Sequence, residues 1–205
     1  ERGYGRAFRE YYLVPMGAAI WSADTTVMLN FPLAFIVRFF RNHGLLNIRN
    51  RPQWRVIEGG SREYIKPLVA GFSDRLRTRA AVKSVRRSSI EEGVELALED
   101  GSVERFDHVV LACHSDQALA MLADPSQAET DILGAIPYQS NDVVLHTDIR
   151  MLPRSRRAWS SWNYLRSPGQ EHATLTYNMN ILQRLSAPDT FCVTLNNTPA
   201  INPHK

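Results

Sequence analysis

The spacing of apolar and polar residues predicts that the chain begins with helices. Residues 3–13 and 15–21 carry helical patterns, and the second segment opens with a proline, which is tolerated in a first turn. A third helix is expected after Asn30, a typical N-cap, and continues to Phe40. Apolar side chains cover much of the circumference of this third helix, so we expect it to be buried among neighbouring elements.

A tight turn at two glycines is expected to separate a short strand from the next helix. The predicted strand covers residues 54–57, and the helix covers residues 62–72, after Gly59 and Gly60. Pro67 should kink or shorten that helix, because proline lacks the backbone donor and clashes with the preceding turn. The glycines could also approach a phosphate, but the segment lacks a third glycine and a following Lys-Ser/Thr, so a structural turn is preferred.

Three strands and a further helix are predicted after this turn. The strands are expected over residues 81–88, 94–100 and 106–113, and the helix over residues 115–123. An Asp-Gly pair between the second and third strands is typical of a tight hairpin. The third strand contains the continuously apolar stretch "HVVLAC", which is the pattern of a strand buried on both faces.

Four more strands are predicted in the last third of the chain. Separated by Pro, Gly and Ser signals, they cover residues 141–149, 157–165, 172–179 and 190–197. Helices at the start, strands and helices in the centre and strands at the end indicate a mixed α/β and α+β fold. His146 lies on the first of these strands, where we expect a half-exposed sheet histidine.

The charge is unevenly distributed along the chain. Residues 1–90 hold 16 Lys and Arg against 6 Asp and Glu, whereas residues 91–205 hold 8 against 15. A basic half can serve nucleic acid, an anionic membrane surface or a phosphorylated cofactor, but without a dense Lys/Arg run a solvated surface is preferred. The longest apolar stretch, residues 31–40, contains Arg38 and is shorter than the ~20 residues of a membrane span, so none is expected.

The cysteines and histidines indicate neither a disulfide framework nor a metal site. Cys113 and Cys192 have no CxxC spacing, and we expect Cys113 in the core. No pair of the six histidines has the spacing of a zinc site. The N-terminal residues lack the plan of a secretory signal, so a cytoplasmic protein is expected.

A particular order of motifs occupies the centre of the chain. A Gly-Gly-Ser turn and a helix precede "RLRTRAAVKSVRR", an Asp-Gly hairpin and then "FDHVVLACHSDQAL". In this order, residues 54–114 resemble the middle of the flavin-containing amine oxidase family, which includes monoamine oxidases, protoporphyrinogen oxidases and phytoene desaturases. The segments "LVPMGAAIW", "ACHSDQAL" and "YNMNILQ" are similar to bacterial NAD/FAD-binding oxidoreductases of this superfamily.

The resemblance implies a domain organisation and a cofactor. Residues 53–137 would be the central part of a Rossmann-like FAD/NAD(P)-binding domain. Residues 1–52 would be a helical part of the substrate domain, and residues 138–205 its β-rich part with an antiparallel sheet. The complete protein would oxidise a C–N or C–C bond by hydride transfer to FAD.

The resemblance also implies cofactor-binding positions. Val82 matches the valine whose strand contacts the adenine of FAD, a contact made by the backbone. Ala112 and His114, at the end of the predicted 106–113 strand, would lie beside the cofactor.

An aromatic surface on the late strands is the candidate substrate pocket. Trp162 and Tyr164 share one strand face by period-two alternation, and Tyr177 and Met179 extend it on the next strand. Ordinary core or sheet-surface packing is the alternative for all four. As a pocket they would accept a small, largely apolar molecule, because flavin pockets are mostly apolar with a few polar groups.

The sequence also departs from the family pattern. No G-x-G-x-x-G occurs anywhere, although this turn and the helix after it hold the FAD pyrophosphate. We therefore expect an internal fragment of a longer flavoprotein, which alone neither retains FAD nor has activity.

No residue is assigned as catalytic. Ser115, His146 and Asp148 could be combined into a triad, but no G-x-S-x-G elbow supports one. In flavin chemistry the cofactor carries the electrons, so the lack of an obvious nucleophile does not argue against an enzyme. The sequence specifies no substrate, electron acceptor or oligomeric state.

A function of a different class stays open beside the enzyme. A non-catalytic interaction domain could bind nucleic acid or an anionic surface through its basic first half. This reading requires one exposed patch formed by Arg38, Arg41, Arg49, Arg51 and Arg55. The enzyme reading implies no nucleic-acid partner.

Overall fold

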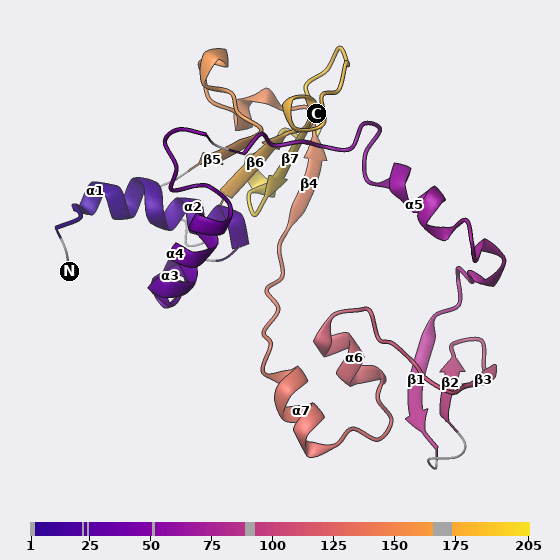
Figure 1. The fold of residues 1–205 in the computed structure, drawn as a ribbon. Coiled ribbons are helices and arrows are strands. Elements are labelled where there is room, and N and C mark those ends of the chain that lie inside the picture. Colours follow the sequence, from indigo (N-terminus) through magenta and orange to yellow (C-terminus); the bar gives the residue numbers. More distant parts are fainter. Residues whose placement is uncertain (1–2, 22, 24, 51, 89–92, 166–173) are drawn as a thin grey trace. The chain divides into compact units, whose positions relative to one another are not determined.

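The computed structural model describes most of the chain as two compact units (Figure 1). The described ranges are residues 3–21, 23, 25–50, 52–88, 93–165 and 174–205. Unit 1 combines Glu1–Pro67 with Ser140–Lys205, and unit 2 is Leu68–Gln139. Because residues from both ends of the sequence belong to unit 1, local sequence patterns do not show which segments form it.

Helices form the first part of unit 1. They are α1 (Arg6–Phe8), the π-helix η1 (Arg9–Leu13), α2 (Val14–Trp21), α3 (Thr25–Leu29) and α4 (Leu33–Asn42). The helices predicted over 3–13 and 15–21 are present, joined without a break through the π-helical turn. The third predicted helix is α4, but its N-cap is Pro32 and the expectation for Asn30 was wrong. The sequence patterns did not predict α3.

These helices enclose a small apolar core. Its buried members are Ala18, Ala23, Met28, Ile36 and Phe40. The ring of Trp21 contacts the rings of Phe31, Phe35 and Phe39 at centroid distances of 5.4, 5.6 and 4.8 Å. Helix α4 is nevertheless buried on one side only, because Leu33 and Val37 are exposed. The expectation of burial all round was wrong.

An antiparallel four-stranded sheet completes unit 1. Its order is β4-β7-β6-β5, with β4 (Val143–His146), β5 (Trp162–Leu165), β6 (Thr174–Asn178) and β7 (Cys192–Leu195). All four predicted strands are present but shorter, because the described residues at their ends are unpaired or form short helices. The helix α8 (Met179–Leu182) begins where the Asn178 side chain accepts the N–H of Ile181 at 3.2 Å. Met179 therefore does not share a strand face with Tyr177, contrary to the prediction.

Contacts between helices and sheet hold unit 1 together. Tyr164 of β5 packs against the helical core. Single 3₁₀ turns complete the connections of the two units: η2 (Ser73–Arg75), η3 (Ile149–Met151), η4 (Arg156–Ala158) and η5 (Thr198–Ala200). In the described ranges, no helix has both the length and the apolar character to span a bilayer.

The sheet of unit 2 is a three-stranded antiparallel meander. It contains β1 (Val82–Arg87), β2 (Val94–Leu98) and β3 (Val103–Phe106). The predicted Asp-Gly hairpin joins β2 to β3, and Gly101 adopts φ 86°, a left-handed conformation that glycine tolerates. Asp100 Oδ1 accepts the backbone N–H of Ser102 at 2.9 Å, which closes the turn.

Helices in and beside unit 2 agree with the sequence patterns in two of three cases. Helix α5 (Arg62–Val69) contains Pro67 and ends before the predicted residue 72, and α6 (Ser115–Met121) matches the predicted helix. Helix α7 (Gln127–Gly134) was not predicted, although Ser126 and Glu129 form a capping box, which is a sequence signal for a helix start. The Ala123 N–H donates to the Val85 carbonyl at 2.9 Å and fixes the end of α6 to β1.

Two predicted strands are absent from the described structure. Residues 54–57 are extended without ladder pairing, and of residues 106–113 only Phe106 belongs to a strand. Val110 is 89% exposed and Cys113 is exposed, so burial on both faces and a core position for Cys113 were wrong. Such a strand requires paired neighbours and covering layers, and the described part of the chain pairs no strand with it.

Candidate functional site

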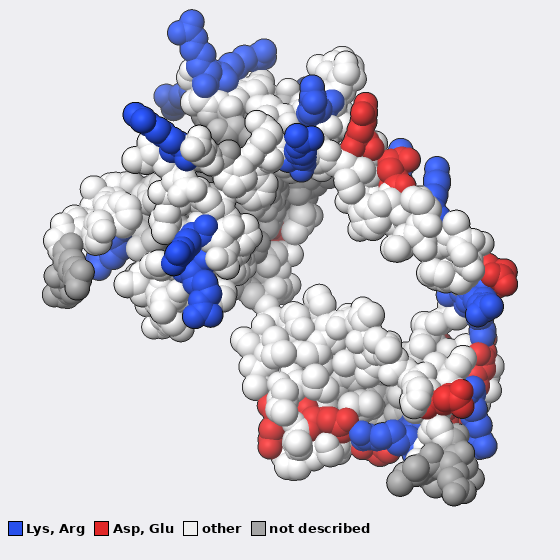
Figure 2. Space-filling view, in the orientation of Figure 1, with Lys and Arg blue, Asp and Glu red and all other residues white. Residues whose placement is uncertain are grey.

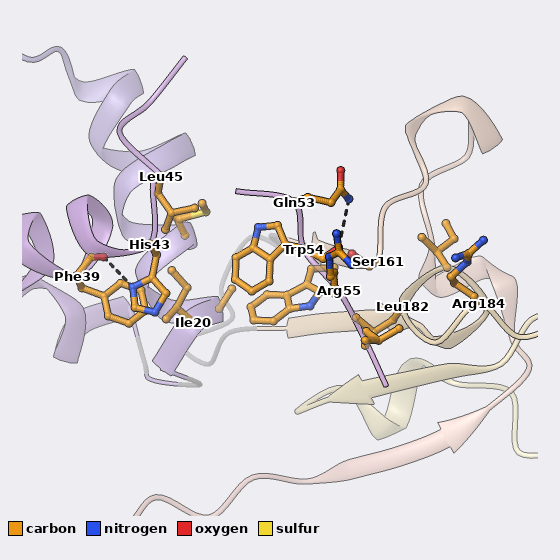
Figure 3. Close-up of a pocket in the computed structure, with 15 residues that line it drawn as sticks. Ile20, Phe39, His43, Leu45, Gln53, Trp54, Arg55, Ser161, Leu182 and Arg184 are labelled. Carbon is orange, nitrogen blue, oxygen red and sulfur yellow. Dashed lines mark hydrogen bonds between the residues drawn. The ribbon is translucent and has the colours of Figure 1, made fainter. Parts of the chain in front are cut away.

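Unit 1 contains a cavity of about 1190 Å³ (Figure 3). Three parts of the chain form it: helices α2 and α4 with the turn after α4, the extended residues 53–56, and β5 with α8. The lining residues discussed below are Ile20, Phe39, His43, Leu45, Gln53, Trp54, Arg55, Ser161, Trp162, Leu182 and Arg184. A cavity of this size with mostly apolar walls is typical of a small-molecule site.

One end of the cavity is apolar and comes from the helices. Ile20, Phe39 and Leu45 lie there beside His43 (Figure 3). The His43 ring stacks on the Phe39 ring at a centroid distance of 3.9 Å, and Nδ1 lies 2.9 Å from the Phe39 carbonyl oxygen. Since a carbonyl only accepts, Nδ1 carries the hydrogen and Nε2 of the neutral ring stays an acceptor.

Two indoles contribute to the walls of the cavity. Trp54 belongs to the extended segment, where the Gln53 amide donates to the Trp54 carbonyl at 3.2 Å. Trp162 begins β5 and meets Tyr177 of β6 edge-on, with ring centroids 5.4 Å apart. This T-shaped contact orients the Trp162 ring through the cross-strand pair. The extended segment thus forms a wall of the cavity without pairing in a sheet.

Two guanidinium groups line the same cavity. Arg55 belongs to the extended segment and Arg184 follows α8. Neither forms an ion pair with another described residue. Two unpaired cations in a mostly apolar cavity can bind an anionic group.

Arg184 has an unusual backbone conformation. It adopts φ 54° directly after the helix C-cap, and the Leu185 N–H donates to the Asn180 carbonyl at 3.0 Å, as in a Schellman motif. Glycine is the usual residue at this position, because a Cβ in the left-handed region costs about 1–2 kcal/mol. Arg184 therefore occupies a backbone position that favours glycine.

The structure separates the four residues predicted for the substrate pocket. Trp162 lines the cavity, and Tyr177 supports it by the ring contact. Tyr164 packs on the helical core, and Met179 starts α8 without lining the cavity. Their assignment to a substrate pocket stays a prediction.

The sequence patterns missed several residues of the cavity. Trp54 and Arg55 were placed on a strand, and Arg184 follows a helix that was not predicted. For Arg184 no sequence signal exists, because a left-handed arginine cannot be read from residue type.

The predicted cofactor-binding residues all lie in unit 2 but do not share one cavity. Val82 lines a cavity of about 160 Å³ together with Leu98 and Phe106. Ala112 and His114 are exposed and do not line it. The His114 ring stacks on Tyr138 at a centroid distance of 4.4 Å, next to the start of α6.

The described residues do not by themselves fit FAD. The cavity at Val82 is much smaller than typical small-molecule sites of 300–1,000 Å³. The sequence has no G-x-G-x-x-G turn, and Gly59 shapes a turn, since an added Cβ would lie 2.8 Å from the Glu63 side chain. The cofactor roles of Val82, Ala112 and His114 stay predictions, and we derive no chemical step from them.

His146 belongs to a buried polar network and not to a half-exposed strand face, so that expectation was wrong. Its Nδ1 accepts the Asp148 N–H at 3.0 Å, so the hydrogen of the neutral ring is on Nε2. Nε2 lies 2.7 Å from Thr194 Oγ1. Thr194 Oγ1 lies 2.8 Å from Thr176 Oγ1. Burial lowers the pKa of His146, although the nearby Asp148 charge acts in the opposite direction.

Asp148 is the charged member of this network. Its carboxylate accepts from the Arg150 guanidinium and from the Asn202 N–H, both at 2.9 Å, and the arginine bonds hold its pKa well below the usual range. The network is internally satisfied and therefore structural. In the described ranges, no group of three His, Cys, Asp or Glu side chains converges to hold a metal ion.

The family of the chain is shown by comparison with known proteins. Residues 20–179 match the sequence model of the family described as flavin containing amine oxidoreductase. The comparison with curated proteins gave no match. The match covers most of the chain, including α4, unit 2 and the two strands β5 and β6. Full-length members of this family carry FAD, and the chain belongs to the flavin-containing amine oxidoreductases.

Proposed function

We propose that this chain supplies the substrate-binding part of an FAD-dependent oxidoreductase that oxidises a C–N or C–C bond. The observation that carries the proposal is the large, mostly apolar cavity of unit 1 in a chain of this family. In the full-length protein FAD would supply the electron chemistry, and this chain would bind and orient the substrate.

The residues of the chain have defined tasks in this proposal. Ile20, Phe39 and Leu45 hold an apolar part of the substrate, and Trp54 and Trp162 flank it. The acceptor Nε2 of His43 can take a substrate hydrogen bond at the helical end.

The domain assignments from the sequence are part of the same proposal. Residues 53–137 would be the central part of the FAD-binding domain, although residues 53–67 belong to unit 1 and residues 53–56 line its cavity. Support comes from unit 1, which unites the first 67 residues with residues 140–205 and contains the whole cavity. If the two flanking segments build one substrate domain, they are expected to lie in one compact unit.

No specific observation favours the alternative interaction domain. Arg38, Arg41, Arg49 and Arg55 are exposed, Arg55 also lines the cavity, and Arg51 lies outside the described residues. Figure 2 shows Lys and Arg side chains at several separate places with uncharged surface between them. The basic half of the sequence thus does not present one dense patch on this face.

The test uses the full reading frame that contains this chain. We expect visible flavin absorption bands in the purified protein and, under anaerobic conditions, their bleaching by members of a panel of alkyl and aryl amines and unsaturated hydrocarbons. A full-length protein that is colourless and does not take up FAD would overturn the proposal.

A pair of variants assigns the reaction to the cavity. Leu182→Trp fills the lining of the cavity, whereas Leu185→Trp adds the same side chain at an exposed position outside it. Both variants should keep the flavin bands, and only Leu182→Trp should abolish bleaching by the active compound. Equal bleaching in both variants would remove the cavity from the proposal.

A further inference from the structure

The cavity of unit 1 has two chemically different ends. Ile20, Phe39 and Leu45 gather at the helical end, whereas Arg55 lies beside Ser161 and Arg184 lies farther from the helices, beyond Leu182 (Figure 3). A ligand that matches both ends has an apolar body and a polar head. The polarity of the cavity therefore specifies the orientation of the ligand as well as its size.

The charge of the polar end specifies the sign of that head. No Asp or Glu occurs among the described residues that line the cavity, and neither guanidinium is paired with another described residue. Both cations are therefore available to a ligand. A guanidinium presents a fork of donors that matches a carboxylate or a phosphate in two-bond geometry.

Arg184 has a backbone conformation that is uncommon for a residue with a side chain. Arg184 occupies a left-handed position where glycine relieves the strain of the Cβ. Strained backbone of this kind concentrates at sites of function. The side chain of Arg184 lines the cavity, where its guanidinium can contact a bound ligand.

We propose that the cavity binds an anionic amphiphile, with its carboxylate or phosphate head on the side that Arg55 and Arg184 line and its hydrocarbon body directed toward Phe39. As the substrate class of the enzyme, this inference rests on the proposed function. Both head groups share the chemistry of a compact oxyanion, and the experiment below distinguishes them. The hydrocarbon body reaches the helical end, where Ile20 and Leu45 complete an apolar wall.

The experiment measures binding by isothermal titration calorimetry to the full-length protein. Decanoate, decyl phosphate and the neutral decanol are titrated separately. We expect at least one of the two anions to bind at least about tenfold more tightly than decanol, as expected for charge-assisted hydrogen bonds. Longer chains in the same series should gain about fourfold in affinity per added methylene until the cavity is filled.

Three variants assign the binding to named side chains. Arg184→Gly and Arg55→Met should each weaken the anion about tenfold or more and leave decanol unchanged. Arg184→Gly is also expected to melt no lower than the parent protein, because glycine relieves the left-handed backbone, so its loss of binding is not a loss of fold. Arg38→Met, an exposed change outside the cavity, is the matched control and should keep full affinity.

The outcomes separate this inference from the proposed function. Equal affinity for decanol and both anions, or unchanged anion binding in Arg55→Met and Arg184→Gly, would overturn the inference even in a yellow, active flavoprotein. Binding of an anion that depends on both arginines would support the inference. A colourless protein with such binding would overturn the flavin proposal alone, because the calorimetric readout does not require flavin.

Discussion

The polar groups of the two sheets find their hydrogen-bond partners in different places. In unit 1, strand β6 is buried along most of its length, and the threonines at 174 and 176 have no exposed surface. In unit 2, three of the four residues of β3 are exposed. The first sheet therefore has to satisfy hydroxyl and imidazole groups internally, whereas water satisfies the second.

The charged groups of the two units follow the same difference. Asp148 in unit 1 is buried and its carboxylate accepts bonds from the Arg150 side chain and the Asn202 backbone. In unit 2, Glu129 pairs with Arg87 at 2.8 Å on the surface. This bond, together with the hydrogen bonds from the N-cap residue Ser126, lowers the pKa of Glu129 to about 2. The depressed pKa does not make the exposed pair a large source of stability, because water screens it. Similar bonds thus stabilise the two units to different degrees.

The largest effect is expected from Asp148→Ala. Removal of the buried carboxylate leaves the Asn202 N–H and the Arg150 N–H without their acceptor, which should lower the free energy of unfolding by about 3 kcal/mol or more. Tryptophan fluorescence during urea unfolding reports on unit 1, because all four tryptophans belong to it.

The same measurement tests whether the two units unfold independently. The Asp148→Ala change should move the fluorescence transition and leave a circular-dichroism component from unit 2 in place. A single shared transition in the parent and the variant would show that the two units unfold as one.

A second, smaller effect is expected from Gly93→Ala in unit 2. Gly93 adopts φ 74°, and an added Cβ would lie 2.4 Å from the Phe106 carbonyl oxygen. The backbone must shift in addition to accepting left-handed strain, so we expect a loss of about 2–3 kcal/mol. The matched control Gly101→Ala has φ 86° with open space around the Cβ and should cost only the strain, about 1 kcal/mol. Equal losses would contradict the close approach at Phe106.

The pH dependence of unit 1 tests the buried histidine. Burial lowers the pKa of His146 in the folded state, so the unfolded state binds the proton first as the pH falls. The stabilisation is complete above the unfolded pKa of about 6.5 and is lost below it, by at most about 1.4 kcal/mol per pH unit. Urea unfolding followed by fluorescence at a series of pH values should show this slope, and His146→Asn should flatten it. An unchanged slope in the variant would assign the effect to another group.

The smallest effect is expected from Glu129→Gln in unit 2. The glutamine keeps an oxygen that can accept the Ser126 N–H, while the charge that faces Arg87 is lost. Because the pair is exposed, the unfolding transition of unit 2 by circular dichroism should shift least of all the variants. A shift as large as that of Asp148→Ala would remove the contrast between surface and buried pairs.

Local patterns predicted those parts of the fold that depend on neighbouring residues. The Asp100-Gly101 hairpin, helix α6 and the four strands of unit 1 were recognised because turn chemistry and alternation act over a few residues. The same reasoning overlooked the capping box of α7, a signal that was present in the sequence. Strand length was predicted less well, since strand ends depend on how far the partner strand extends.

The sequence by itself determined the family and the mixed architecture, because both depend on the order of local elements. Only the tertiary structure decided that Trp54, Arg55 and Arg184 share one cavity with the helices. It likewise decided that His146 is buried and that Val110 is exposed. Burial and convergence depend on residues distant in sequence, so the physical environment of a side chain is specified only when the chain has folded around it.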